Sequence, residues 1–225
     1  MQHHRPVYDI TPFTVLDYPE HLAAIIWFAK CNIRCDYCYN PDIVFSEGKI
    51  SEDEVFAFLK KRVGMLEAVV LSGGEATLYK NIVEFSKQIK DLGFKIKLDT
   101  NGLKPAVLKE LISLKLIDYV ALDYKAPKGK FEFITKSTYY EKFEDSLNFL
   151  LASDVEFEVR TTVHTDLLDE DDINEIIKDL KSKNYKANYY LQAYLHTDKT
   201  LGNIKGPSRE FSKAKLLDIL PIVWR

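Results

Sequence analysis

Residues 28–44, "FAKCNIRCDYCYNPDIV", contain all three cysteines of this chain, Cys31, Cys35 and Cys38. An odd number of cysteines packed into one short segment argues against a disulfide framework. In a reducing compartment, such a group is more often metal-binding or catalytic. The thiols are separated by three residues and then by two, and together they indicate a site for a soft metal.

The sequence offers no fourth cysteine to complete a coordination shell. A structural zinc ion normally takes four protein ligands, so a Cys₃His zinc site would need His21, His164 or His196, which are remote in sequence. An iron–sulfur cubane also normally takes four thiolates. With three thiolates, one iron stays open to a ligand from outside the protein, which makes a reactive site. Buried, inert cysteines fit poorly, because "CNIRCDYC" is a polar segment.

The composition is ordinary for a globular protein of 225 residues, with 46% apolar and 29% charged residues, and its length predicts one domain. The net charge of −3 gives no basic field, so we expect neither nucleic acid nor a membrane as a partner. No apolar run approaches the roughly 20 residues of a membrane-spanning helix. The opening "MQHHRPVYDI" lacks a signal-peptide pattern, and we therefore expect a cytoplasmic protein.

Strand-like apolar runs alternate with amphipathic helical stretches along the chain. The predicted strands are 22–29, 67–74, 94–102, 118–125, 155–163 and 187–194, and the predicted helices are 51–62, 81–93, 104–116, 138–153, 169–183 and 209–220. This alternation predicts a parallel sheet with right-handed crossovers. Both an open doubly wound sheet and an incomplete eight-fold barrel satisfy it. In either fold, ligands gather at the carboxyl ends of the strands.

Polar or glycine residues stand at the ends of the predicted strands, where such ligands would bind. They are Gly73, Gly74 and Glu75 after the second strand, Asp99 and Thr100 after the third, Asp123 and Lys125 after the fourth, and Arg160 late in the fifth. The cysteine segment follows the first strand. If the sheet is parallel, we expect all of these residues at one edge.

The CxxxCxxC spacing, with Tyr37 just before the third cysteine, resembles the radical S-adenosylmethionine (SAM) superfamily. The resemblance implies that Cys31, Cys35 and Cys38 hold a 4Fe–4S cluster whose open iron is chelated by SAM. In that family, reductive cleavage of SAM gives a 5′-deoxyadenosyl radical that abstracts hydrogen. The family fold is an incomplete (β/α)₆ barrel of parallel strands. We therefore expect one radical-SAM domain over 1–225, with a cluster loop at 30–40 and a C-terminal helix at about 209–220.

The same resemblance implies roles for the strand-end residues. Gly73-Gly74-Glu75 is similar to the family's GGE motif, which binds the methionine amino group, although the usual following proline is here Ala76. "KLDTNG" and "ALDYK" are similar to strand ends of glycyl-radical-enzyme activases, where a monovalent cation assists. The remaining implied cofactor contacts are Asp99, Thr100, Asp123, Lys125 and Arg160 near the SAM carboxylate and Tyr37 beside the adenine.

"TPFTVLDYP" (11–19), leading into the first strand, resembles activating proteins of the anaerobic (class III) ribonucleoside-triphosphate reductase. Those proteins usually have Gly where Glu20 stands and often His where Tyr39 stands. The resemblance implies an oxidoreductase that removes a Cα hydrogen from a glycine of the reductase and leaves a glycyl radical. It also implies an electron donor such as flavodoxin or ferredoxin as a partner.

Other functions remain open at this point. The chain could activate another glycyl-radical enzyme, of the pyruvate formate-lyase type, or be another small radical-SAM enzyme such as a 7-carboxy-7-deazaguanine synthase-like ring contractase. A different class is a zinc-binding structural or adaptor protein, or an iron–sulfur redox sensor. That class leaves the GGE segment and the strand-end charges without a role.

Overall fold

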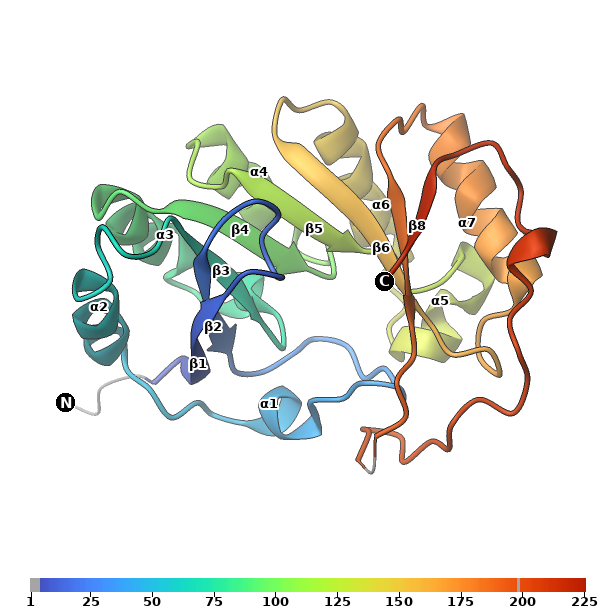
Figure 1. Ribbon diagram of the computed structural model, residues 1–225, viewed down its shortest axis with the longest axis horizontal. Helices are drawn as coiled ribbons and strands as arrows, with labels where there is room; N and C mark the ends of the chain where they lie inside the picture. The colour runs from blue at the N-terminus through green and yellow to red at the C-terminus, as the bar shows by residue number, and fades with distance from the viewer. Residues whose placement is uncertain (1–4, 198) are drawn as a thin grey trace. The chain divides into compact units, whose positions relative to one another are not determined.

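The computed structural model describes residues 5–197 and 199–225 (Figure 1). Within these residues, eight strands form a sheet in the order β1 to β8, the order of the chain. Strands β2, β3 and β4 pair in parallel, as do β6, β7 and β8, whereas β1 runs antiparallel to β2. The predicted parallel α/β architecture is confirmed, with an additional strand before the first predicted one and another after the last.

The strands span Val7–Thr14 (β1), Ala23–Phe28 (β2), Ala68–Gly73 (β3), Lys95–Thr100 (β4), Tyr119–Asp123 (β5), Glu156–Val163 (β6), Tyr189–Ala193 (β7) and Ile222–Trp224 (β8). The helices span Pro41–Phe45 (α1), Glu52–Lys60 (α2), Ile82–Asp91 (α3), Pro105–Ser113 (α4), Lys128–Thr135 (α5), Tyr140–Leu151 (α6) and Glu170–Ser182 (α7), with 3₁₀ turns at Ala76–Leu78 (η1) and Lys213–Lys215 (η2). Across the described residues, no helix has both the length and the apolar character needed to cross a bilayer.

Local sequence signals set several helix ends. The Ser51 hydroxyl accepts the backbone N–H of Glu54, and the Glu54 carboxylate accepts the N–H of Ser51, which is the capping box predicted for α2. Asp169 and Asp172 make the corresponding pair of hydrogen bonds at the start of α7. Gly93 follows α3 with a φ of +88°, a conformation that favours glycine.

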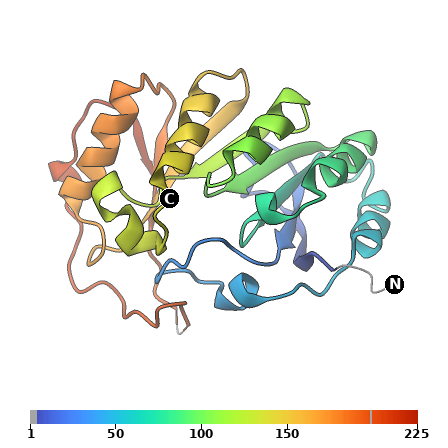
Figure 2. The same ribbon diagram turned by 180° about the vertical axis from the view of Figure 1, so that it is seen from behind.

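The chain forms two compact units. The first contains the residues up to 32 together with 42–100 and 104–121. Its β2 and β3 are in register from Ala23 opposite Ala68 to Phe28 opposite Gly73, so the cysteine segment begins beside the GGE segment. Figure 2 shows α3 and α4 on the same side of β3 and β4.

The second unit contains residues 33–41, 101–103 and 122–225. Its β6 and β7 are parallel and in register up to Val163 opposite Ala193, so their carboxyl ends coincide. Helices α6 and α7 lie beside these strands (Figures 1 and 2). The aromatic ring of Phe143 in α6 is completely buried.

The predicted C-terminal helix at 209–220 is wrong. Only Lys213–Lys215 forms a helical turn, and β8 follows at Ile222–Trp224. Tertiary hydrogen bonds compete with the helix: the guanidinium of Arg209 and the backbone N–H of Ser212 both donate to the Glu170 carboxylate. The segment therefore lies extended against the start of α7.

Candidate functional site

The three cysteines form no disulfide. Cys31 belongs to the first unit and follows Lys30, whose φ of +71° turns the chain sharply after β2. Cys35 and Cys38 belong to the second unit and are joined by a turn in which the Cys38 N–H donates to the Cys35 carbonyl at 3.0 Å. Burial raises the pKa of the Cys35 thiol to about 11, although the positive charge of Lys125 opposes the increase.

The GGE segment contacts the start of the cysteine segment through its backbone. The N–H of Gly74 donates to the Phe28 carbonyl and that of Glu75 to the Lys30 carbonyl, each at 2.9 Å. A Cβ on Gly74 would lie 2.0 Å from the Lys30 oxygen, and one on Gly73 would lie 2.3 Å from the Phe28 oxygen. These glycines are therefore required by close packing of two backbones, a reason that the sequence did not reveal.

The Glu75 carboxylate is held inside the first unit. Its side chain is 2% exposed, and its Oε1 accepts the N–H of Thr77 at 3.2 Å and the hydroxyl of Thr100 at 2.9 Å. The structure thus brings together two residues that were predicted separately as cofactor contacts. The Thr77 hydroxyl donates to the same oxygen, so the two threonines fix the orientation of the carboxylate before any ligand binds.

Asp99 contacts a residue that the sequence analysis missed. The Lys97 ammonium lies 2.6 Å from Asp99 Oδ1, and the Ser72 hydroxyl donates to Oδ2 at 3.0 Å. Lys97 is only 2% exposed, although a lysine in a strand normally reaches solvent. The one available signal is spacing, because residues i and i+2 of a strand share a face.

Asp123, Lys125 and Arg160, each predicted to lie near the SAM carboxylate, form one charged cluster in the second unit. The Lys125 ammonium lies 2.9 Å from Asp123 Oδ2, and Arg160 Nε lies 2.5 Å from Oδ1. Burial opposes ionisation of Asp123, but Arg160 and Lys125 outweigh it and hold the pKa of that carboxyl well below its usual range. Two cations around one anion leave the cluster with a charge of about +1, which suits a ligand carboxylate.

Tyr37, which lies between Cys35 and Cys38 in the sequence, is buried and only 4% exposed. Its hydroxyl lies against the Cys35 thiol, and burial, followed by the charge of Cys35, raises the pKa of that hydroxyl. The three soft thiol donors of this segment fit an iron–sulfur cluster, which without a fourth thiolate has one iron for an additional ligand.

In the described part of the chain, no three His, Cys, Asp or Glu side chains are grouped to hold a single metal ion. A 4Fe–4S cubane does not need its ligands to converge on one metal ion, since each thiolate binds a separate iron. His21, a candidate fourth ligand for zinc, has both ring nitrogens engaged: Nδ1 lies 3.2 Å from Glu67 and Nε2 lies 3.1 Å from the Lys95 ammonium.

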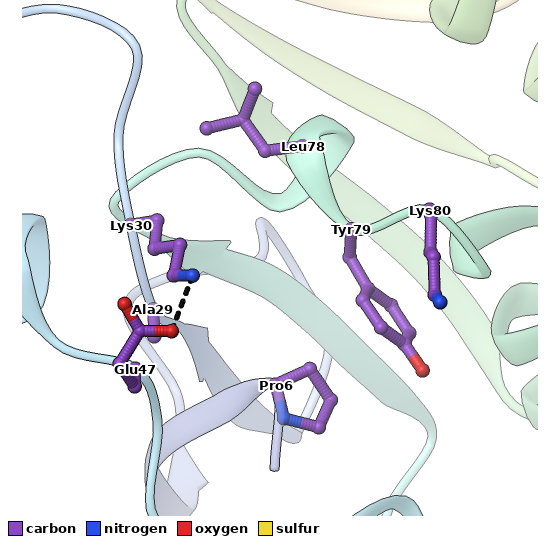
Figure 3. A pocket seen from close by; sticks show the side chains of 7 residues that line it. All are labelled: Pro6, Ala29, Lys30, Glu47, Leu78, Tyr79 and Lys80. Atoms are coloured by element: carbon purple, nitrogen blue, oxygen red, sulfur yellow. Dashed lines mark ion pairs between the residues drawn. The ribbon is translucent and has the colours of Figure 1, made fainter. Parts of the chain in front are cut away.

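A pocket of about 180 Å³ opens in the first unit beside the residue that precedes Cys31 (Figure 3). It is lined by Pro6, Ala29, Lys30, Glu47, Leu78, Tyr79 and Lys80. Lys30 and Glu47 form an ion pair at one side of it, and none of the predicted site residues lines it. Its volume is below the range of about 300–1,000 Å³ that is typical of small-molecule sites. It is therefore no candidate for the SAM site.

Two proteins of known sequence are similar to most of this chain. A protein of Methanocaldococcus jannaschii whose provisional name is glycyl-radical enzyme activating enzyme is 35% identical over 184 residues, which cover 78% of this chain and 75% of that protein. A second M. jannaschii protein with the same provisional name is 28% identical over 200 residues, covering 82% and 72%.

The fold also matches solved structures. Streptococcus suis SuiB bound to S-adenosylmethionine superposes with a TM-score of 0.67 over 89% of this chain, at 14% sequence identity. The chain spans about half (51%) of the length of that structure. The likeness supports the expected partial (β/α) barrel.

The radical SAM superfamily domain matches residues 25–185, which include all three cysteines and the GGE segment. Members of this superfamily use a 4Fe–4S cluster and SAM. On this match, together with the cysteine spacing and the charged cluster, the chain belongs to the radical SAM superfamily.

Proposed function

We propose that this protein activates a glycyl-radical enzyme, and that its partner is an anaerobic ribonucleoside-triphosphate reductase. The likeness to the two M. jannaschii proteins carries the first part of the proposal. The "TPFTVLDYP" opening at residues 11–19 supports the reductase as the partner. An activase of the pyruvate formate-lyase type is the second candidate.

In this proposal Cys31, Cys35 and Cys38 hold the cluster, which together with SAM would supply a carbon-centred radical able to take a glycine hydrogen. The other proposed site residues of the chain would bind and orient SAM. Asp123, Lys125 and Arg160 together carry a charge of about +1, which one SAM carboxylate would neutralise. No general base is required, because hydrogen-atom abstraction moves a proton and an electron together.

Glu75 would face the SAM ammonium. Its carboxylate is already fixed by the hydroxyls of Thr77 and Thr100, so little side-chain entropy remains to be lost on binding. Asp99 and Tyr37 complete the proposed cofactor contacts, with Tyr37 beside the adenine. A flavodoxin- or ferredoxin-type donor would deliver the electron.

The test begins with anaerobically reconstituted protein, dithionite and SAM. We expect about four iron and four sulfide per chain and the formation of 5′-deoxyadenosine, which Cys31→Ala, Cys35→Ala or Cys38→Ala abolishes. Asn40→Ala is the matched control, because Asn40 is exposed in the same loop. Cleavage of SAM by any of the three cysteine variants would refute the cluster assignment.

The partner is tested by electron paramagnetic resonance after this protein is mixed with candidate glycyl-radical enzymes. A glycyl-radical doublet with the anaerobic reductase, and none with pyruvate formate-lyase, supports the proposal. Substituting the partner's radical glycine by alanine must remove the doublet. SAM cleavage without a glycyl radical on either partner would instead indicate another small radical-SAM reaction.

A further inference from the structure

The segment that follows β7 lies against the half of the cysteine loop that carries Cys35 and Cys38. We call residues 199–209 the belt. In Figure 1 it is part of the orange-red segment that follows β7. The Leu201 N–H donates to the Cys38 carbonyl at 3.0 Å, and the Gly202 N–H donates to the Asp36 carbonyl at 2.8 Å. Two consecutive backbone amides therefore bind the loop at the turn that joins the two cysteines.

Gly202 approaches the loop more closely than any other residue type could. A Cβ on Gly202 would lie 2.5 Å from the Cβ and 2.9 Å from the Cα of Asp36. The Asp36 Cα is a backbone atom and its Cβ is bonded to that atom, so a side chain at position 202 would force the loop backbone to move. The absence of a side chain is thus a condition for the two hydrogen bonds.

The turn that presents these amides is itself fixed. Thr200 is 3% exposed, its carbonyl accepts the N–H of Asn203 at 3.1 Å, and its hydroxyl accepts the N–H of Ile204 at 3.1 Å. A turn held at both its carbonyl and its side chain presents the following amides in one orientation.

The far end of the belt is anchored to the chain after β6. His164 Nε2 lies 2.9 Å from the Lys205 carbonyl, and the Thr165 hydroxyl donates to the Arg209 carbonyl at 2.6 Å. The loop has a second, separate anchor, because the Lys136 ammonium after α5 lies 2.8 Å from an Asp36 carboxylate oxygen. The loop is therefore held from two sides, by the belt and by the end of α5.

We propose that the Thr200–Gly202 turn positions the two cluster thiols of Cys35 and Cys38, and that Gly202 is the positioning residue on which this depends. The inference rests on the proposed cluster. Ligands in a loop bind a cluster tightly only if neighbouring groups fix their geometry, and loss of such a support typically costs about 10–100-fold in affinity.

The test compares Gly202→Ala with Gly206→Ala, a glycine-to-alanine change in the same belt. The atoms nearest to a Cβ on Gly206 belong to the side chain of His196, at 3.4 Å or more, which is ordinary van der Waals contact. After reconstitution, we expect Gly202→Ala to lose iron to a chelator about tenfold faster than wild type and to show a shifted spectrum of the reduced cluster. Gly206→Ala should match wild type in both measurements, and far-UV circular dichroism should match in all three proteins.

Thr200→Val is the second variant, in case Gly202→Ala does not fold. It keeps the volume of the side chain but removes the acceptor for the Ile204 amide, and we expect a smaller change in the same direction. Wild-type chelator kinetics and spectrum in the folded Gly202→Ala protein, or in Thr200→Val if the former is unfolded, would overturn the inference.

A readout on metal-free protein separates this inference from the proposed function. Alkylation of Cys38, followed by peptide mass spectrometry, should be faster in Gly202→Ala than in wild type, because the loop is released. If wild-type protein takes up no cluster, the proposed function fails, and the alkylation rates alone decide the role of the belt. Equal rates in the two proteins would then exclude it.

Discussion

Replacement of Lys97 by methionine should destabilise the first unit through Asp99. The Lys97 ammonium lies 2.6 Å from Asp99 Oδ1, with the two side chains 2% and 12% exposed. Methionine keeps an unbranched side chain but removes the charge. Loss of one partner of a buried ion pair costs about 3–5 kcal/mol. Because Asp99 retains the Ser72 hydroxyl at 3.0 Å, we expect the lower end, about 3 kcal/mol.

The assay is urea unfolding of the metal-free protein under anaerobic conditions. Lys95→Met is the matched control, because Lys95 lies on the same strand and is exposed, and it should change the free energy of unfolding by only about 0.5 kcal/mol. Addition of Asp99→Asn to Lys97→Met should restore part of the loss, since it removes the uncompensated charge. A cost below about 1 kcal/mol for Lys97→Met, or no recovery in the double variant, would refute the reasoning.

Three further predictions follow from single residues. Glu20→Gly should raise the free energy of unfolding in urea by about 1 kcal/mol, because Glu20 has a φ of +63°; an unchanged value would contradict this. Hydrogen bonds from Arg209 and Ser212 lower the pKa of Glu170 to about 2, so its stabilising effect is complete above the unfolded pKa of about 4.3 and is lost as the pH falls towards 2. The melting temperature of Glu170→Gln should therefore lie below that of wild type at pH 7 and converge with it at pH 2; a constant difference would count against this carboxylate. Burial raises the pKa of Cys35 to about 11, so its alkylation in metal-free protein should be slow at pH 8 and increase up to about pH 11, whereas a midpoint below pH 9 would contradict its burial.

Local and periodic signals predicted most of the regular structure. The capping box at Ser51 and the glycine at position 93 mark ends of α2 and α3, as expected. The first strand, β1, was not predicted, because Pro12 interrupts its pattern. Proline is tolerated there since β1 is an edge strand of the sheet, next to β2.

The features that were missed depend on contacts between distant parts of the chain. The pattern at 209–220 favours a helix, but Arg209 and Ser212 bind Glu170, 39 and 42 residues away along the chain. Lys97 looks like a solvent-facing residue of an alternating strand, yet Ile96 and Lys97 are both buried, because a parallel strand is covered on both faces. Sequence spacing cannot report which remote partner makes such burial favourable.

Some residues of the candidate site could likewise be proposed from the sequence, whereas others depend on contacts between distant segments. The cysteines were proposed from their spacing, and Glu75 and the charged residues from their positions at the ends of predicted strands. Gly202 was not, because its role is defined only by the distance of its backbone from Asp36. When a glycine is needed because a distant backbone segment lies close to it, the residues next to it in the sequence do not indicate this need.

The two departures from the reductase-activase pattern have opposite structural consequences. Glu20 occupies a left-handed conformation that a glycine would adopt without strain. Glutamate at this position therefore lowers the free energy of unfolding relative to glycine, and the fold tolerates the loss. Tyr39, where those proteins often have histidine, has acquired partners: its hydroxyl accepts the Leu195 N–H at 2.7 Å, and its ring stacks on Tyr194 with centroids 5.3 Å apart. Histidine is too short to replace both contacts. Tyr39 therefore connects the chain directly after β7 to the cysteine loop, next to Cys38 in sequence, and adds contacts to those that the Leu201 and Gly202 amides make with the same loop.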